Sequence, residues 1–212
     1  MLYFREGIRG GMGRSPIHGG EEILDAARDL ILEGGLSAAS TAAIGKRSGA
    51  STGSLYHRFP SRDHLLAELW VRTVRRYQRG LVAAAAQPGE PLEVAMGAAA
   101  WTLEFAAGHE VDARFLLVAR REELLANPNV SLQLMAELAD LNEPLRRVVR
   151  GLARRLWGRP SAAELELTSI AVLDLPFTVA RRHLLAGTKV GRHRAAALAA
   201  VRALLRAGVK GI

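Results

Sequence analysis

The sequence predicts an all-α fold. Apolar residues recur at helical spacing through nearly every segment, and no segment has the strict alternation that is typical of a half-buried strand. Breaks rich in glycine and proline divide the chain into helix-sized pieces. Cysteine is absent from all 212 residues, which excludes disulfides and cysteine-ligated metal sites.

The first helix is predicted at residues 21–33. Two glutamates and Asp25 lie near its N-terminus, where negative charge is favourable, and Gly34-Gly35 ends it. The twenty residues before it include six glycines and no apolar stretch long enough for a signal peptide. Residues 1–20 are therefore predicted to form a flexible N-terminal arm, and the alternative is an over-long start, with Met12 as the other candidate for the first residue.

Two short helices are predicted next. Thr41 is expected to cap the first of them, which runs through Ser48. Gly49 starts a turn, and Ser51 is expected to cap the second helix. This helix should end near Phe59, because the proline that follows Phe59 disfavours a helical conformation there.

The remaining helices are longer. Ser61 is expected to cap a helix that runs to about Ala86, and a Gln-Pro-Gly break follows it. Pro144 either divides one long helix or kinks it. Pro176 should kink its helix, because proline has no N–H to donate. Further helices are expected at about 90–108, 110–126, 129–142, 144–157, 161–187 and 191–208.

The two short helices, joined by a glycine turn and braced by the first helix, match a helix-turn-helix pattern. Residues 51–54 read Ser-Thr-Gly-Ser, and such small side chains let a helix backbone approach the base edges of DNA. Their hydroxyls and amides can also bind phosphate. Residues 41–62 contain four cationic residues and no acidic residue. The spacing and the charge together favour a DNA-binding segment over an ordinary loop.

Residues 21–70 resemble the DNA-binding domain of the tetracycline-repressor (TetR) family. The motifs that carry the resemblance are TAAIG at 41–45, GAS at 49–51, GSLYHRF at 53–59 and SRDHL at 61–65. Gly45 stands where the family usually has alanine, which is expected to loosen the second helix by about 1 kcal/mol. The resemblance implies the DNA-binding residues: Thr41 and Tyr56 on phosphates; Ser51 at the helix cap; Thr52, Gly53 and Ser54 facing bases; His57 and Arg58 at the groove edge; and Arg62, in place of the family's lysine, on a phosphate.

The resemblance also implies a domain organisation. A helix-turn-helix domain at 21–68 would precede a helical effector-binding and dimerisation domain at 69–212, with a homodimer formed through the last two helices. A two-fold dimer would present its recognition helices about 34–36 Å apart, which matches two half-sites one turn of DNA apart. The last two helices carry apolar residues that a single domain would cover poorly, namely Leu184, Leu185, Leu198, Val201, Leu204 and Leu205.

A cavity for an effector would be built from apolar and aromatic side chains between the C-terminal helices. The candidates are Met96, Trp101, Phe105, Phe115, Met135 and Phe177, each of which could instead pack the core. Asp174 lies in an apolar run beside Pro176, and burial of a carboxylate is costly unless it is paired. It either meets a polar or cationic ligand or pairs with an arginine such as Arg181 or Arg182.

Positive charge is concentrated in two further places, and the formal net charge is +8. Residues 181–212 contain eight cationic residues and no acidic one, and these are expected on solvated faces of the last two helices. Arg72, Arg75, Arg76 and Arg79 line one face of the fourth helix, and a solvated face is again preferred to a role in DNA binding.

No pattern for catalysis is present. The second histidine of a zinc-protease motif is missing after His109-Glu110, the nucleophile elbow of hydrolases is absent, and the six histidines lack metal-ligand spacing. We therefore expect no enzymatic activity, no cofactor and no metal.

The predicted function is a cytoplasmic, homodimeric transcriptional repressor that a small-molecule effector releases from a palindromic double-stranded DNA operator, with no membrane partner. One alternative is a helical small-molecule-binding protein or enzyme without DNA binding. Another is a membrane-surface protein that uses its basic C-terminus.

Overall fold

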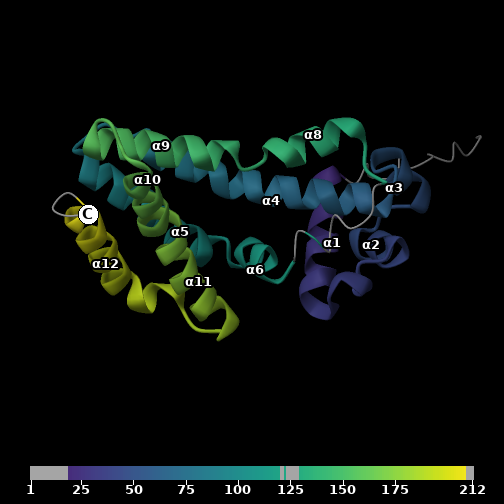
Figure 1. Ribbon diagram of the computed structural model, residues 1–212. Helices are drawn as coiled ribbons and strands as arrows, with labels where there is room; N and C mark the ends of the chain where they lie inside the picture. Colours follow the sequence, from purple (N-terminus) through teal and green to yellow (C-terminus); the bar gives the residue numbers. More distant parts are fainter. Residues whose placement is uncertain (1–18, 120–121, 123–128, 209–212) are drawn as a thin grey trace, which may run out of the picture.

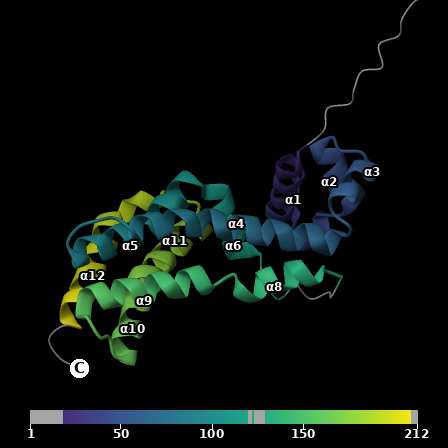
Figure 2. The ribbon, with the colours of Figure 1, turned by 90° about the horizontal axis from the view of Figure 1, so that it is seen from above.

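The computed structural model describes residues 19–119, 122 and 129–208 of the chain. These residues form helices and contain no strand, so the all-α prediction is confirmed. In Figures 1 and 2, α1, α2 and α3 gather at one end of the molecule and α12 lies at the other, with the long helix α4 between them. The predicted arm lies outside the described residues apart from Gly19 and Gly20, and Gly20 begins α1.

The N-terminal helices are α1 (Gly20–Gly34), α2 (Thr41–Ser48) and α3 (Thr52–Arg58). A 3-10 turn, Leu36–Ala38, joins the first two. The expected cap at Thr41 is wrong by one residue. Ser40 has an extended backbone, and its Oγ accepts from the backbone N–H of Ala43 at 3.2 Å, so Thr41 is already the first residue of the helix.

The turn between α2 and α3 has the expected geometry. Gly49 is left-handed, with φ 76° and ψ 2°, a conformation that favours glycine. Ser51 caps α3 as predicted, because its Oγ accepts from the N–H of Ser54 at 3.1 Å. An added Cβ at Gly45 would lie 3.1 Å from the Ala50 carbonyl oxygen, so glycine at this position lets α2 approach the turn closely.

Helix α4 spans Arg62–Ala85 and is capped by Ser61 as predicted, with the N–H of His64 donating to its Oγ at 3.0 Å. Phe59 is extended, so the break before Pro60 is also confirmed. The later helices are α5 (Pro91–Gly108), α6 (Glu110–Val118), α8 (Leu132–Asp140), α9 (Glu143–Trp157), α10 (Ala162–Ser169), α11 (Leu175–Leu185) and α12 (Arg194–Ala207).

Two of the expected C-terminal helices have other bounds in the structure. The helix expected at 110–126 ends at Val118, and that expected at 129–142 spans Leu132–Asp140. Residues 120–121 and 123–128 lie outside the described residues. Pro144 divides rather than kinks, because it lies in the first turn of α9, after a break at residues 141–142.

The segment expected as one helix at 161–187 contains a π-helical turn, Ile170–Asp174, between α10 and α11. In this turn the N–H of Leu175 donates to the carbonyl of Ile170, five residues earlier. The wider turn lies directly before Pro176, which has no N–H for a regular helical bond. The disturbance expected from Pro176 thus takes the form of a π-helical turn.

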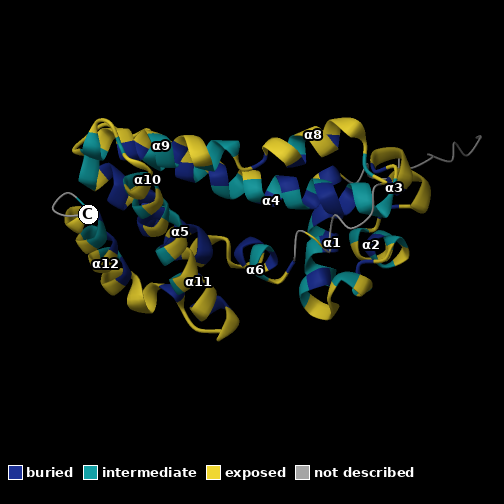
Figure 3. Cartoon of the chain, in the orientation of Figure 1, coloured by how far each residue is buried: buried dark blue, intermediate teal, exposed yellow. Residues whose placement is uncertain are grey.

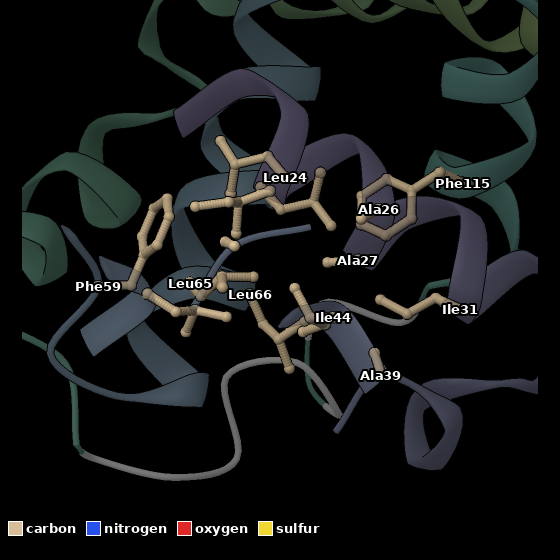
Figure 4. Packing of buried hydrophobic residues seen from close by; sticks show 14 of the residues in the cluster. Leu24, Ala26, Ala27, Ile31, Ala39, Ile44, Phe59, Leu65, Leu66 and Phe115 are labelled. Atoms are coloured by element: carbon tan, nitrogen blue, oxygen red, sulfur yellow. The ribbon is translucent and has the colours of Figure 1, made fainter. Parts of the chain in front are cut away.

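The core of the N-terminal helices includes one residue from the C-terminal region. Phe115 of α6 is fully buried in the same cluster as Ala27, Ile44 and Leu65 (Figure 4). A second cluster joins α4, α5, α9 and α12 and contains Met96, one of the cavity candidates. A third cluster holds Ala113 of α6 with residues of α5 and α11, so α6 is part of both halves of the molecule.

The apolar stripes of the last two helices are covered within one chain, contrary to expectation. Leu184, Val201 and Leu205 are buried, because α11 and α12 both pack on α5. Leu198 and Leu204 are partly buried against the same clusters. Leu185 differs, with 61% of its surface exposed.

Helix α5 contacts α4 closely at Gly80. The ring of Trp101 lies over this glycine, and its Nε1 donates to the carbonyl of Tyr77 at 2.9 Å. A Cβ added at Gly80 would overlap Trp101 Cζ2, so an alanine there requires the indole ring or one of the two helices to move. Trp101 therefore packs the contact between the two helices.

Replacement of Gly80 by alanine is expected to lower the free energy of unfolding by about 1–3 kcal/mol, the usual cost of overpacking, as measured by urea denaturation. Gly97→Ala, on the exposed face of α5 with open space around it, is the matched control and should stabilise the chain by about 0.4–1 kcal/mol. Equal stability of Gly80→Ala and the wild type would contradict the close contact.

Candidate nucleic-acid interface and internal cavity

Helix α3 presents one exposed face and one buried face. Leu55 and Phe59 are buried in the N-terminal core, whereas Tyr56 is 49% exposed and His57 is exposed beside it. Figure 3 shows α3 coloured largely as exposed. Ser51 caps α3 with its side chain, which fixes the backbone at the start of the helix. The residues at this start are exposed. The helix can therefore offer its N-terminal end and its outer face to a ligand.

The predicted DNA-binding residues at the helix starts are accessible. Ser51, Thr52, Gly53 and Ser54 are all exposed, and no atom lies within 4 Å of a Cβ built at Gly53. Thr41 is half-buried at the first turn of α2, which packs against α3. These small residues leave the N-terminus of α3 unobstructed.

The two predicted arginines lie differently from the rest. Arg62 donates from Nε to the carbonyl of Ala39 at 2.6 Å, and its Nη2 donates to the carbonyl of Leu36. It therefore fastens the 3-10 turn to α4 through Nε and Nη2, and its contact with a phosphate stays a prediction. Arg58 is exposed, but its guanidinium lies against Gly20 at the start of α1.

Of the four arginines of α4 that we expected on a solvated face, Arg79 is exposed as expected, whereas Arg72, Arg75 and Arg76 join α4 to other helices. Arg72 pairs with Glu21 at 2.9 Å and with Asp25 at 2.8 Å, both on α1. Arg75 pairs with Glu137 of α8 at 3.0 Å. The spacing of four residues between Arg72 and Arg76 indicates that they share one face of α4. It does not predict their ion pairs, because the acidic partners are distant in the sequence.

Asp112 of α6 is the centre of a second group of ion pairs. It is 3% exposed, and its two carboxylate oxygens accept from Arg28 of α1 at 2.8 Å and from Arg76 of α4. Burial opposes ionisation of this carboxyl, but the hydrogen bonds from both arginines outweigh it and hold the pKa of Asp112 below its ordinary value. Sequence analysis missed this residue.

A cavity of about 300 Å³ lies between α4, α5, α6, α9 and the segment from the π-helical turn into α11. Of the predicted effector residues, Phe105, Asp174 and Phe177 line it. The other four do not: Met96 and Trp101 pack between helices, Phe115 lies in the N-terminal core, and Met135 is 51% exposed on α8. The cavity residues that sequence analysis missed include Trp70, Val74 and Tyr77, which share one face of α4.

Most of the cavity lining is apolar, and its polar groups fall into two sets. Tyr77 and Thr102 form a hydroxyl pair, with 2.9 Å between their oxygens, and Phe105 packs edge-on against Tyr77 at 5.4 Å. Burial raises the pKa of the Tyr77 phenol, which the hydrogen bond with Thr102 opposes. The second set, Asn142, Asp174 and Arg181, is exposed to solvent at the rim of the cavity.

Asp174 was expected either to pair with an arginine or to meet a ligand. Within the described residues its carboxylate forms no ion pair, and the residue is exposed. The π-helical turn places Asp174 beside the cavity without burying it, so no partner is needed to offset desolvation.

Neither a membrane span nor a metal site is found in the described residues. No helix there is long and apolar enough to cross a membrane. No group of three or more histidine, cysteine, aspartate or glutamate side chains in the same part of the chain could hold a metal ion.

Comparison with known proteins finds one family model that residues 23–69 match. This segment matches the model described as "Bacterial regulatory proteins, tetR family", which confirms the resemblance found in the motifs. No curated protein matches the chain significantly.

Solved structures match nearly the whole chain. A TetR-like transcriptional regulator from a Rhodococcus species is 22% identical, with 91% of this chain and 96% of that chain covered and a TM-score of 0.65. The TetR family transcriptional regulator PfmR from Thermus thermophilus is 21% identical, with 89% and 96% covered and a TM-score of 0.66. The transcriptional regulator FadR from Bacillus subtilis, in complex with stearoyl-CoA, is 15% identical, with 92% and 100% covered and a TM-score of 0.66. At these identities the likeness establishes a shared fold.

Proposed function

We propose that this chain, whose residues 23–69 belong to the tetR family of bacterial regulatory proteins, is a homodimeric transcriptional repressor that a small-molecule effector releases from a palindromic operator. The observation that carries the proposal is α3: a serine-capped helix with an unobstructed N-terminus and an exposed outer face, held by a buried leucine and phenylalanine. Small side chains at its start suit an approach to base edges in the major groove.

Phosphate contacts would supply most of the affinity, and base contacts the sequence preference. Tyr56 and the half-buried Thr41 are suited to phosphates, and Thr52, Gly53 and Ser54 to bases. Lys46 of α2 is exposed and forms no ion pair or hydrogen bond within the described residues, so it adds a cation that is available to the backbone of DNA. Arg47, in contrast, pairs with Glu33, and Arg62 is used inside the domain.

The test is selection of bound duplexes from a random DNA pool with the full chain. The proposal predicts a pseudo-palindromic consensus whose affinity falls steeply as salt rises, because bound phosphates release counterions. If no sequence is enriched while the chain is folded and dimeric, the chain is not a DNA reader. The alternative of a helical small-molecule-binding protein without DNA binding would then take its place.

The dimer is proposed to form through the exposed faces of α11 and α12. After the buried apolar stripe is set aside, the outer face of α12 consists largely of alanines, including Ala199 and Ala203, and Leu185 of α11 is exposed. Small residues let helices of two chains approach closely. Arg194 and Arg202 flank this face but pair with Glu104 and Glu93 of the same chain.

An Ala199→Glu/Ala203→Glu chain is expected to be a monomer in light scattering at micromolar concentration, because four carboxylates would be buried unpaired in a two-fold interface. The matched control is Ala83→Glu/Ala136→Glu, at two exposed alanines of α4 and α8, which should remain dimeric. A dimeric Ala199→Glu/Ala203→Glu chain would exclude this face as the interface.

Effector release is proposed to act through α6. One part of this helix lines the cavity with Ala113, Leu116 and Leu117. Asp112 and Phe115, on the same nine-residue helix, hold α1 and α4 through ion pairs and burial. An occupant that moves α6 would therefore move the N-terminal helices, and by linkage DNA would weaken effector binding by the same factor.

The effector is proposed to be smaller than the ligand of the solved FadR complex. A cavity of 300 Å³ holds about ten heavy atoms when each takes the ~30 Å³ that water occupies in the liquid. A stearoyl group is larger than this, so we do not propose the ligand of that FadR as the effector of this protein.

A further inference from the structure

The hydroxyl pair in the cavity contains one proton that has no acceptor. Tyr77 and Thr102 carry one hydroxyl proton each, and the contact between their oxygens uses one of them. Neither hydroxyl forms another hydrogen bond within the described residues. Whichever residue donates, the other keeps a free O–H.

Thr102 differs in this respect from two other buried threonines in helices. Thr73 Oγ1 donates to the carbonyl of Leu69 at 2.8 Å, and Thr168 Oγ1 donates to that of Glu164 at 2.6 Å. Both satisfy their protons four residues back in their own helix. Thr102 is 4% exposed and instead turns its hydroxyl to Tyr77 at the cavity wall. A buried hydroxyl without its full set of partners is costly, so this arrangement calls for a partner from outside the chain.

The charges around the cavity limit what that partner can be. Arg181 and Asp174 line its exposed rim and carry opposite charges, so neither sign is favoured overall. Among the described residues that line the cavity, these two are the only charged ones, and the remaining walls are mostly apolar. A ligand with a charged group next to the hydroxyl pair would lose its hydration without a counter-ion.

Resting on the function proposed above, we propose that the effector is a small, mostly apolar molecule with one uncharged hydrogen-bond acceptor, a ketone, ester or ether oxygen, which accepts from the Tyr77–Thr102 pair. The cavity volume suits a molecule of about ten heavy atoms. The aromatic walls formed by Trp70, Phe105 and Phe177 suit a flat or cyclic apolar body.

The test uses two probes of equal size, acetophenone and its hydrocarbon isostere α-methylstyrene, which differ in one oxygen. Their binding to the full chain is measured by calorimetry for the wild type and for Tyr77→Phe/Thr102→Val. The double variant removes both hydroxyls with little change of shape. Acetophenone affinity is expected to fall about fivefold to tenfold, and α-methylstyrene affinity to stay the same or to rise.

Thr73→Val is the matched control, because it removes a buried hydroxyl that is already bonded within its helix and lies outside the cavity. It should leave the affinity for both probes unchanged. An equal loss for the two probes in the double variant, or a wild type that binds neither, would overturn the inference.

Failure of this inference can be told apart from failure of the proposed function, because DNA selection with the wild-type chain needs no ligand. If an operator is selected but the wild type shows no preference for acetophenone, the repressor function stands and the proposed hydrogen-bond acceptor on the effector is wrong. If no operator is selected but acetophenone is preferred, the Tyr77–Thr102 pair binds an acceptor in a protein that does not read DNA.

Discussion

Replacement of Asp112 by asparagine is expected to lower the free energy of unfolding at pH 7 by about 2–3 kcal/mol, measured by urea denaturation. The carboxylate is buried and accepts from two arginines, so its removal takes the buried anion from both guanidinium groups. Arg28 keeps Asp25 and Asp29, and Arg76 keeps Glu21, but these carboxylates are more exposed. Breaking a fully buried pair costs about 3–5 kcal/mol, and the value is discounted here because Arg76 is 30% exposed. Asp140→Asn, at an exposed carboxylate of α8, is the control and should change stability by less than about 0.5 kcal/mol.

The pH dependence of the same variant has a definite sign. The pKa of Asp112 is lower in the folded chain than its ordinary value of 3.8, so ionisation of this group stabilises the folded state above that value. The contribution is lost as the pH falls through the lowered pKa. The difference in stability between wild type and Asp112→Asn should therefore be constant from pH 7 to pH 5 and shrink below about pH 4. A difference that stays constant at acid pH would contradict the ion pairs.

The variant also separates the function of α6 from its contribution to stability. If α6 couples the cavity to DNA, Asp112→Asn should still bind a selected operator but should respond less to an occupant of the cavity. A typical coupling free energy of about 1–3 kcal/mol corresponds to a roughly 5- to 150-fold change in operator affinity, which anisotropy resolves easily. A full response in the variant would show that the coupling does not pass through these ion pairs.

A Tyr56→Ala chain is expected to bind the selected operator about 10- to 100-fold more weakly than the wild type, because a hydrogen bond to a charged group is worth about 1.5–3 kcal/mol. Tyr56 is 49% exposed, so the variant should unfold at the same urea concentration as the wild type. Tyr56→Phe keeps the ring and removes only the hydroxyl, and its affinity should fall by a similar factor. Wild-type affinity in both variants would exclude Tyr56 from the DNA contact.

The helix starts could be predicted from the sequence because their causes are local. The Ser51 and Ser61 hydroxyls accept from N–H groups three residues later. Gly49 adopts the left-handed conformation of the turn, and Pro60 disfavours a helical conformation at the residue before it. The misplaced cap at Thr41 has the same origin. Ser40 and Thr41 are both good caps, and the choice depends on the backbone that leads in from the 3-10 turn.

The contacts that the sequence did not reveal join residues far apart in the chain. Arg62 was expected on a phosphate because a cation at the start of a helix suits one, but its acceptors are two carbonyls of the preceding turn. Phe115 and Trp101 were reasonable cavity candidates by residue type. Which of them lines a cavity depends on how α6 and α5 sit on α4, and no local pattern encodes that packing.

The most direct measurement of the central claim, that the start of α3 reads DNA bases, is a comparison of the sequences selected by wild type and by Thr52→Ala. Thr52 is exposed at the first turn of α3 and supports no other part of the fold that the structure describes. The account predicts the same pseudo-palindrome with the same half-site spacing, but a relaxed base preference at one position, repeated symmetrically in both half-sites. An identical consensus from the two proteins, with equal affinities, would contradict the claim that this face of α3 meets the bases.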